Sequence, residues 1–476
     1  MIRSNPAFRL YLLATFTFAF ILPFSQTSAE TSVSGVFGSG MVLQRDQSIV
    51  VWGRDDPQTL VTVRVAGRKA GATTGTDGRW KVNLAELRAG GPHVMVVEGS
   101  STIRFDDVLV GEVWLCTGQS NMDWPVRVFA NAAMEIAAGD HPRIRHFKIK
   151  NRPAGKGLAA VETLNAWEVC SPATVGDFTA VGYYFGRYLE KQLDVPIGLI
   201  GSTWGGTRIE PWISPEGYHS VSALAEIAQN LDQFPKKDDK GNISHQSALA
   251  LYNGMIHPLV PYSIRGVLWY QGESNLADGM IYREKMKALI QGWRKVWNRE
   301  DLPFYYVQLA PFRYKNGFLP VIWEAQLATL AVPHTGMAVT VDIGNLNDIH
   351  PANKQDVGKR LALWALARTY GHSGVVYSGP LYHSMRIEDG RVRLFFDFLG
   401  GGLVSRDQKA LVGFTIAGAD QKFVKAAAVL EGDSVVVSSP DVVQPVAVRF
   451  GWQVEVELNL SNAAGLPASP FRTDNW

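Results

Sequence analysis

The sequence predicts a doubly wound α/β domain in the middle of the chain, with a β-rich region on either side of it. Runs that are apolar on both faces recur through the middle, as the strands of a parallel sheet covered on both sides require. Segments with helical periodicity separate these runs, and repeated strand and helix units imply right-handed crossovers. The outer parts instead show short alternating segments between turn signals, which are typical of antiparallel strands.

Residues 1–29 have the layout of a secretory signal peptide. Arg3 and Arg9 precede an apolar run at 10–24, and the small residues 27–29 follow it. This run of 15 residues is broken by Pro23 and is shorter than the roughly 20 residues that span a bilayer, which argues against a membrane anchor. We therefore expect signal cleavage, a mature chain without a membrane span, and a periplasmic or secreted location.

The charge balance argues against a nucleic-acid partner. Removal of residues 1–29 takes away two arginines and no acid, which lowers the formal net charge from +2 to zero and leaves no indication of a polyanionic partner. The 14 Trp and 46 Gly are more typical of secreted proteins that contact sugars. Cys116 and Cys170 could pair in an exported protein, but a buried free thiol is the simpler interpretation of Cys116.

Residues 30–106 are expected to form a small antiparallel β-domain. The segments at 61–65 and 93–97 are rich in valine, and turn signals stand at 76–78 and 90–92. The same pattern of short alternating segments between turn signals is found in residues 376–476, where a hairpin is expected about Asp389 and Gly390, followed by further such segments. This last part is expected to be a second β-rich region.

Residues 107–375 are expected to form the α/β domain. Five apolar runs predict its strands, at 108–116, 195–201, 264–272, 304–310 and 337–344. Three periodic segments predict helices, at 179–194, 282–297 and 354–370. The stretch at 214–247 ends in polar residues and is expected to be a long loop.

Polar groups follow these apolar runs, and this is the edge at which open α/β sheets bind ligands. In chain order they are Ser120; Gly205 and Gly206; Gln271, Glu273 and Asn275; and Asp342, Asp348 and His350. Each has a simpler explanation. A serine at this position fits a helix N-cap, and the two glycines fit a tight turn. The residues of the third group could be solvated loop residues, and a single histidine is usually structural. Their convergence at one sheet edge favours a shared site instead.

Together these groups supply the parts that acyl transfer needs. A serine hydroxyl becomes a nucleophile when an imidazole accepts its proton, and a carboxylate fixes the tautomer of that imidazole. The tetrahedral oxyanion needs donors such as a serine N–H, a glycine N–H and a side-chain amide. The GxSxG elbow of α/β-hydrolases is absent, because Met122 occupies the position of its second glycine. A different serine hydrolase architecture is therefore required.

The chain resembles the sialate O-acetylesterases and related carbohydrate acetylesterases of the SGNH hydrolase superfamily. The similarity extends along nearly the whole mature chain, and the motifs GQSNM and QGESN are its most specific parts. The segments that carry it are MVLQR (41–45), DVLVGEVWLCTGQSNM (107–122), GSTWGGT (201–207), WYQGESN (269–275), NDIHPANKQDVGKRLA (347–362) and GLPASPFRTDNW (465–476).

The resemblance implies a flavodoxin-like three-layer domain and hydrolysis of O-acetyl esters on sugars without a metal or other cofactor. It implies that Ser120 is the nucleophile and His350 the base. It also implies that Gly206, or its neighbour Gly205, and Gln271 donate to the oxyanion beside the Ser120 amide, with Asn275 as an alternative.

The acid departs from the superfamily pattern, which places it three residues before the histidine, where this chain has Asn347. Asp348, two residues before, is the candidate that remains, although a turn is needed for it to reach the His350 ring. Asp342 at the end of the strand, or a backbone carbonyl, is the alternative. Arg208 with Glu210 is expected to form scaffold or to contact substrate.

We therefore expect an exported serine esterase that removes acetyl groups from carbohydrates through an acyl-enzyme. Trp124, Trp204 and Trp212 lie in or after the first two motifs and could stack on sugar rings or pack in the core. One alternative is a non-catalytic sugar-binding protein with a degenerate hydrolase domain. Another is a serine hydrolase of a different acyl substrate. Phosphate-loop and paired CxxC signals are absent, so nucleotide or zinc chemistry is not expected.

Overall fold

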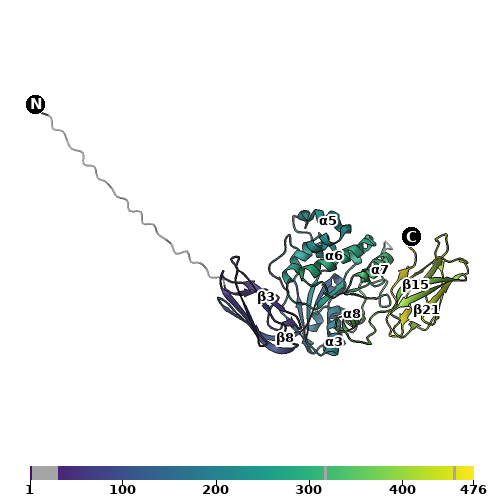
Figure 1. Cartoon of the computed structure of the whole chain (residues 1–476), viewed down its shortest axis with the longest axis horizontal. Coiled ribbons are helices and arrows are strands. Elements are labelled where there is room, and N and C mark those ends of the chain that lie inside the picture. Colours follow the sequence, from purple (N-terminus) through teal and green to yellow (C-terminus); the bar gives the residue numbers. More distant parts are fainter. Residues whose placement is uncertain (3–29, 316–318, 454–456) are drawn as a thin grey trace.

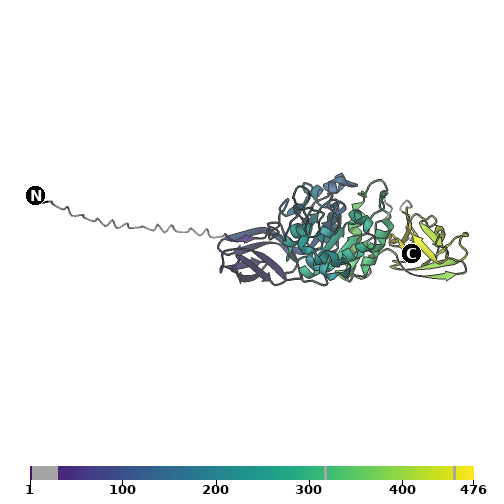
Figure 2. The same cartoon turned by 90° about the horizontal axis from the view of Figure 1, so that it is seen from above.

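The computed structural model describes residues 1–2, 30–315, 319–453 and 457–476. The predicted signal peptide, apart from its first two residues, lies outside the described residues. Three parts follow one another along the long axis of the molecule (Figures 1 and 2): a purple N-terminal β-region, a teal and green α/β domain, and a yellow-green C-terminal β-region. In the described ranges, no helix has the length and apolar character to cross a membrane.

The N-terminal β-region is built from two groups of strands. Its three-stranded antiparallel sheet contains β1 (Ser32–Val33), β3 (Ile49–Arg54) and β6 (Arg79–Leu84). Its second group contains β2 (Val42–Gln44), β4 (Leu60–Val65), β5 (Arg68–Thr73) and β7 (Gly90–Glu98). Alternate residues of β4 are fully or almost fully buried, as the valine pattern predicts. The antiparallel β-region is confirmed, except that β2 pairs in parallel with the following strand.

Strand β8 (Thr102–Gly118) belongs to two sheets at once. Its first half pairs antiparallel with β7. Its second half, from Glu112 to Gly118, pairs in parallel with β11 (Ile197–Thr203) and, from Trp114, with β12 (Gly266–Tyr270). The boundary expected after residue 106 falls inside this strand. Continuous backbone hydrogen bonding therefore ties the N-terminal β-region to the α/β domain.

The central sheet has the strand order β10-β9-β11-β8-β12-β13-β14. Its remaining strands are β9 (His141–Lys148), β10 (Glu168–Cys170), β13 (Phe304–Val307) and β14 (Thr335–Ala338). Only β10 runs antiparallel to its neighbour. Taken alone, β11-β8-β12-β13-β14 has the order 2-1-3-4-5 of flavodoxin-like folds. The predicted flavodoxin-like α/β domain is thus confirmed, with β9 and β10 added at one edge.

Helices cover both faces of this sheet (Figure 1). Helices α3 (Ala180–Leu193) and α8 (Lys354–Arg368) pack together on one face. On the other face, α6 (Ile281–Val296) packs against α4 (Pro215–Ser220) and α7 (Leu319–Ala328). The three predicted helices are confirmed to within two residues at each end. The segment expected to be a loop contains α4 and the short helix α5 (Ala225–Gln229), and α2 (Ala132–Ala137) follows the first motif.

In the described residues, the C-terminal β-region contains three small antiparallel sheets. One has the order β15-β16-β21-β20, with bounds Leu381–Glu388, Arg391–Asp397, Ser434–Ser438 and Ala427–Glu431. A second has the order β19-β18-β22-β24, with bounds Val424–Lys425, Phe414–Ala417, Ala447–Phe450 and Phe471–Arg472. The third pairs β17 (Leu403–Ser405) with β23 (Leu460–Asn462). The hairpin about Asp389 and Gly390 is confirmed, and both residues have positive φ as a two-residue turn requires.

Both cysteines are buried free thiols. Burial raises the pKa of the Cys116 thiol and of the Cys170 thiol to about 12. The disulfide that an exported chain could form is therefore not present in this structure, and the free-thiol interpretation of Cys116 is confirmed.

Glu112 of β8 links the MVLQR and EVW segments, which lie away from the predicted site. Its side chain is fully buried and receives hydrogen bonds from Arg45 Nε at 2.6 Å and from Arg265 Nε at 2.6 Å. Gln44 Nε2 donates to it at 3.0 Å. The carboxylate thus joins β2, β8 and the segment before β12.

Replacement of Glu112 by alanine is expected to lower the free energy of unfolding by about 3–5 kcal/mol, because it removes a fully buried carboxylate and leaves two partly buried guanidinium groups without it. Urea denaturation measures this loss. Glu98→Ala is the matched control, since Glu98 pairs with Arg64 at an exposed site where the loss is expected to stay below about 1 kcal/mol. Equal losses in the two variants would contradict the structural role assigned to Glu112.

Candidate active site

The turn after β8 places Ser120 at the carboxyl edge of the sheet. Gly118 has a φ of +127°, and a Cβ atom there would lie 2.2 Å from the Tyr270 carbonyl oxygen, so no other residue fits. The Gln119 N–H donates to that same oxygen at 3.0 Å. The short helix α1 (Ser120–Asp123) then begins, with Gln119 at its N-cap. The N-cap interpretation of Ser120 is therefore wrong, because Ser120 is the first helical residue.

The hydroxyl of Ser120 meets the ring of His350. Ser120 Oγ lies 2.9 Å from His350 Nε2, although the two residues are 230 positions apart in the chain. His350 lies in the connection from β14 to α8, which reaches the same sheet edge as the end of β8. Its ring stacks on Trp124 with centroids 3.8 Å apart and planes 18° apart. The Nε2 edge of the imidazole thus meets the hydroxyl, while one face of the ring lies on the indole.

Neither of the predicted acids, Asp348 and Asp342, is hydrogen-bonded to the His350 ring. Asp348 Oδ1 lies 3.7 Å from His350 Nδ1, which is too long for a hydrogen bond. The same oxygen accepts the backbone N–H of His350 at 2.8 Å, and the Asp348 side chain is 56% exposed. Asp342, the alternative, is held by Arg360 through two contacts of 2.7 Å, so its carboxylate is already occupied. Asn347 accepts a hydrogen bond from Arg313.

The pKa of His350 is lowered from its ordinary value of 6.5. Burial is the largest cause, because it penalises the charged ring. The positive charge of Lys354 lowers the pKa further, while the carboxylate of Asp348 opposes both effects. The lowered pKa favours the neutral ring, which is the form that can accept a proton.

Of the expected oxyanion donors, Gly205 lies against Ser120. A Cβ atom on Gly205 would lie 3.4 Å from the Ser120 Cβ, whereas a Cβ on Gly206 would meet nothing within 4 Å. Within the described part of the chain, the backbone N–H groups of Ser120 and Gly205 make no hydrogen bond. Both are thus available to a bound carbonyl oxygen.

The two side-chain amides are not available in the same way. Gln271 is fully buried, and its Nε2 donates to the Thr207 carbonyl at 3.0 Å and to Asn275 Oδ1 at 2.8 Å. Asn275 Nδ2 donates to Glu210 at 3.0 Å and to Asp278 at 2.6 Å. The amide hydrogens of Gln271 and Asn275 are therefore directed at neighbouring protein groups and away from an oxyanion. In this arrangement both side chains support the loop that carries the glycines.

Arg208 and Glu210 lie in the same buried polar cluster. Arg208 donates to Glu210 at 2.7 Å and to Asp278 at 2.9 Å, and Lys285 also pairs with Glu210. Burial alone would raise the pKa of Glu210, but Arg208 and Lys285 lower it to about 2. The guanidinium of Arg208 is thus engaged by carboxylates of the protein, which favours the scaffold role over substrate contact.

The three tryptophans have different surroundings. Trp124 is 38% exposed, and one of its faces lies on His350. Trp204 is partly buried and stacks on His245, with centroids 4.8 Å apart. Trp212 is fully buried and donates its indole N–H to Thr207. Core packing is therefore the correct interpretation for Trp212, while Trp124 and Trp204 remain near the surface around Ser120.

Sequence reasoning missed a buried network beneath Ser120. Glu273, for which a solvated loop position was the simpler explanation, is instead half-buried and accepts hydrogen bonds from Gln119 at 2.5 Å and from Asn121 at 2.6 Å. Lys354 Nζ donates to Asn121 Oδ1 at 2.6 Å. The available signal was that these residues all stand within the motifs GQSNM, QGESN and HPANK, beside the candidate nucleophile and the candidate base.

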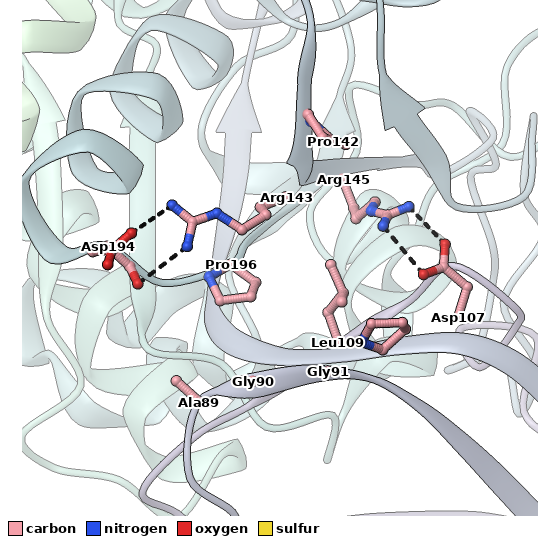
Figure 3. Close-up of a pocket in the computed structure, with 11 residues that line it drawn as sticks. Ala89, Gly90, Gly91, Asp107, Leu109, Pro142, Arg143, Arg145, Asp194 and Pro196 are labelled. Carbon is pink, nitrogen blue, oxygen red and sulfur yellow. Dashed lines mark hydrogen bonds and ion pairs between the residues drawn. The ribbon is translucent and has the colours of Figure 1, made fainter.

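A cavity of about 340 Å³ lies at the other end of the sheet, between the N-terminal β-region and the α/β domain (Figure 3). Its two arginines are paired: Arg143 with Asp194 at 2.7 Å and Arg145 with Asp107 at 2.9 Å. Leu109, which lines it, precedes Gly118 in the same strand by a distance of about 30 Å. This cavity is therefore separate from the candidate active site.

Comparisons with known proteins identify the family of this chain. The family model for "Carbohydrate esterase, sialic acid-specific acetylesterase" matches residues 110–367. The sialate O-acetylesterase of Rattus norvegicus is 31% identical over 403 residues, which cover 72% of this chain and 74% of the relative. The sialate O-acetylesterase of Homo sapiens is 32% identical over 381 residues, which cover 72% of this chain and 71% of the relative.

A solved structure extends the similarity over almost the whole chain. The crystal structure of a carbohydrate acetylesterase from Xanthomonas citri superposes with a TM-score of 0.86 at 41% sequence identity, and the match covers 94% of this chain and 100% of that one. Both β-regions are therefore part of a shared architecture. The chain belongs to the sialic acid-specific acetylesterase family of carbohydrate esterases.

Proposed function

We propose that this chain is an exported serine esterase that removes O-acetyl groups from carbohydrates through an acetyl-enzyme. The single observation that carries the mechanism is the 2.9 Å contact between Ser120 Oγ and His350 Nε2 at the carboxyl edge of the sheet. A degenerate, non-catalytic domain has no reason to keep a hydroxyl and a neutral imidazole in this arrangement. Export is proposed from the predicted signal peptide at residues 1–29.

In the proposed reaction, His350 Nε2 accepts the Ser120 proton while Oγ attacks the acetyl carbonyl carbon. The oxyanion that forms lies against the N–H groups of Ser120 and Gly205, with Gly206 as the neighbouring alternative. The intermediate collapses, the sugar oxygen leaves, and it takes the proton back from His350. Water, activated by the same imidazole, then attacks acetyl-Ser120 and releases acetate.

Asp348 is proposed to assist by charge. Its oxygen, 3.7 Å from Nδ1, stabilises the imidazolium that forms when His350 holds the proton. The indole of Trp124 contributes to the orientation of the ring. The exposed parts of Trp124 and Trp204 are proposed to contact the sugar.

The test is acetate release from a panel of substrates: O-acetylated sialic acid, acetylated xylan and a small neutral acetyl ester. Labelling with an organophosphonate, followed by mass spectrometry of the peptide that contains Ser120, checks the nucleophile at the same time. Labelling at Ser120 with acetate release is the expected result. Acetyl-ester hydrolysis with the label on another serine would overturn the assignment, and labelling without acetate release would point to a different acyl substrate.

We expect kcat/KM to fall as the pH drops below 6.5. His350 must be neutral to accept the Ser120 proton, and burial together with the charge of Lys354 holds the pKa of His350 below 6.5. Activity is therefore retained down to that lowered pKa and is lost as the ring becomes protonated below it. A profile of kcat/KM for a neutral acetyl ester measures the midpoint. A midpoint at or above 6.5 would contradict the expectation.

A further inference from the structure

Lys354 stands in an unfavourable place for a lysine. It is the first residue of α8, where the positive end of the helix dipole opposes a cation. Its side chain has no solvent exposure, and a buried ammonium group carries a large desolvation cost. The helix does not need it as a cap, because the Asn353 side chain already accepts the Asp356 N–H. These costs call for an interaction that offsets them.

The ammonium group of Lys354 contacts the turn that carries the nucleophile. Nζ donates to Asn121 Oδ1 at 2.6 Å and lies 4.7 Å from the ring centroid of Phe129 and 5.4 Å from that of Tyr270. Asn121 directly follows Ser120 in the chain. The rings of Phe129 and Tyr270 and the amide oxygen of Asn121 thus surround the ammonium group, next to the turn that carries Ser120.

Asn121 also binds the loop that carries the proposed base, His350. Its Nδ2 donates to the carbonyl of Ile349 at 3.0 Å and to Glu273 at 2.6 Å. Ile349 directly precedes His350. The residue after the nucleophile therefore binds the residue before the base, and Lys354 fixes the amide that makes both contacts.

The charges around Lys354 come from two segments. Glu273 follows β12, and Asp348 and His350 lie in the loop before α8. Burial lowers the pKa of Lys354 to about 7, and the two carboxylates oppose this effect. Burial raises the pKa of Glu273, while the Asn121 hydrogen bond and the charge of Lys354 counteract it. Lys354 in turn lowers the pKa of His350.

We propose that Lys354 is a positioning residue of the reaction, which fixes the Ser120 turn to the His350 loop through Asn121 and whose charge favours the unprotonated imidazole. The proposal rests on the Ser120 and His350 mechanism given above and adds a residue that touches neither substrate nor reacting atoms. A lysine that only stabilised the fold would leave the pH dependence of the site unchanged. The two roles are therefore separable by experiment.

The test compares Lys354→Met with Lys359→Met in the full chain. Met keeps a similar length without charge, and Lys359 is an exposed lysine of the same helix. The readout is the rate at which an organophosphonate labels Ser120 as a function of pH, because labelling needs the nucleophile and the base but no sugar. In Lys354→Met the midpoint of the acid limb is expected to move up by about half to one pH unit, with slower labelling at every pH. Lys359→Met is expected to keep the native midpoint.

An unshifted midpoint in a folded Lys354→Met protein would overturn the proposal. If that variant does not fold, Lys354→Gln replaces it, because its amide can still donate to Asn121 but carries no charge: a midpoint that moves up supports the proposal, and an unshifted one overturns it. Ser120 labelling without acetate release would refute the proposed substrate while the Lys354 test still stands. Absence of labelling in the native protein would refute both proposals.

Discussion

The Ser120→Ala protein is expected to lose acetyl-ester hydrolysis by at least about 10⁴-fold in kcat/KM while it keeps its fold. The bond from the acetyl carbon to Ser120 Oγ cannot form without that oxygen, and the remaining oxyanion donors provide only a small residual acceleration. The hydroxyl makes its side-chain contact with His350, whereas the network of Asn121, Glu273 and Lys354 beneath it is left intact. Acetate release and thermal unfolding measure the two properties.

Ser202→Ala is the matched control. Ser202 lies near the end of β11, is buried, and donates its hydroxyl to the Met255 carbonyl at 3.1 Å. Its loss is expected to cost about 1 kcal/mol of stability and to leave kcat/KM close to the native value. Hydrolysis at the native rate by Ser120→Ala would mean that another residue is the nucleophile. A comparable loss of activity in both variants would point to general disruption of the sheet edge.

Much of the central fold follows from the sequence, because its parallel strands are buried on both faces and read as continuous apolar runs. Strand β9 was not predicted, because its segment is not a continuous apolar run. Its segment, HPRIRHFK, contains Arg145 and His146, which look exposed by composition but are almost fully buried in the structure. The continuity of β8 was also missed, since the alternating half near residue 104 and the apolar half after residue 108 read as different elements. The first half of β8 belongs to the half-exposed sheet with β7, and its second half belongs to the central sheet, which is covered on both faces.

The candidate site could be predicted only in its outline. Ser120 and His350 follow from the rule that strand ends converge at one edge. The partners of Gln271 and the partial burial of Glu273 could not be predicted, because they depend on side-chain packing between segments far apart in the chain. A glutamate in a polar loop motif carries no local signal of enclosure. What distinguishes it is the presence of Asn121 and Lys354 within reach, and only the tertiary structure provides this.

The second large effect is expected at His350, and it contrasts with a small effect at Asp348. His350→Gln is expected to lower kcat/KM by at least about 10³-fold, because among the residues that the structure describes no other group that can accept a proton at neutral pH is hydrogen-bonded to Ser120 Oγ. Asp348→Asn is expected to lower it by no more than about 10-fold. A buried acid that is hydrogen-bonded to its histidine contributes far more than this in serine proteases, but Asp348 is 56% exposed and 3.7 Å from Nδ1, so water screens its charge.

The ratio of these two losses separates two mechanisms. If Asp348→Asn loses as much activity as His350→Gln, the acid must close on the imidazole during the reaction and form a full triad. If its loss stays near tenfold, the site works as a serine and histidine pair whose ring is oriented mainly by Trp124, and Trp124→Leu should then lower kcat/KM more than Asp348→Asn does. The His350 ring stacks on Trp124 with centroids 3.8 Å apart, whereas Asp348 makes no hydrogen bond to Nδ1. This difference favours the second outcome. Steady-state rates for the three variants on one neutral acetyl ester decide between them.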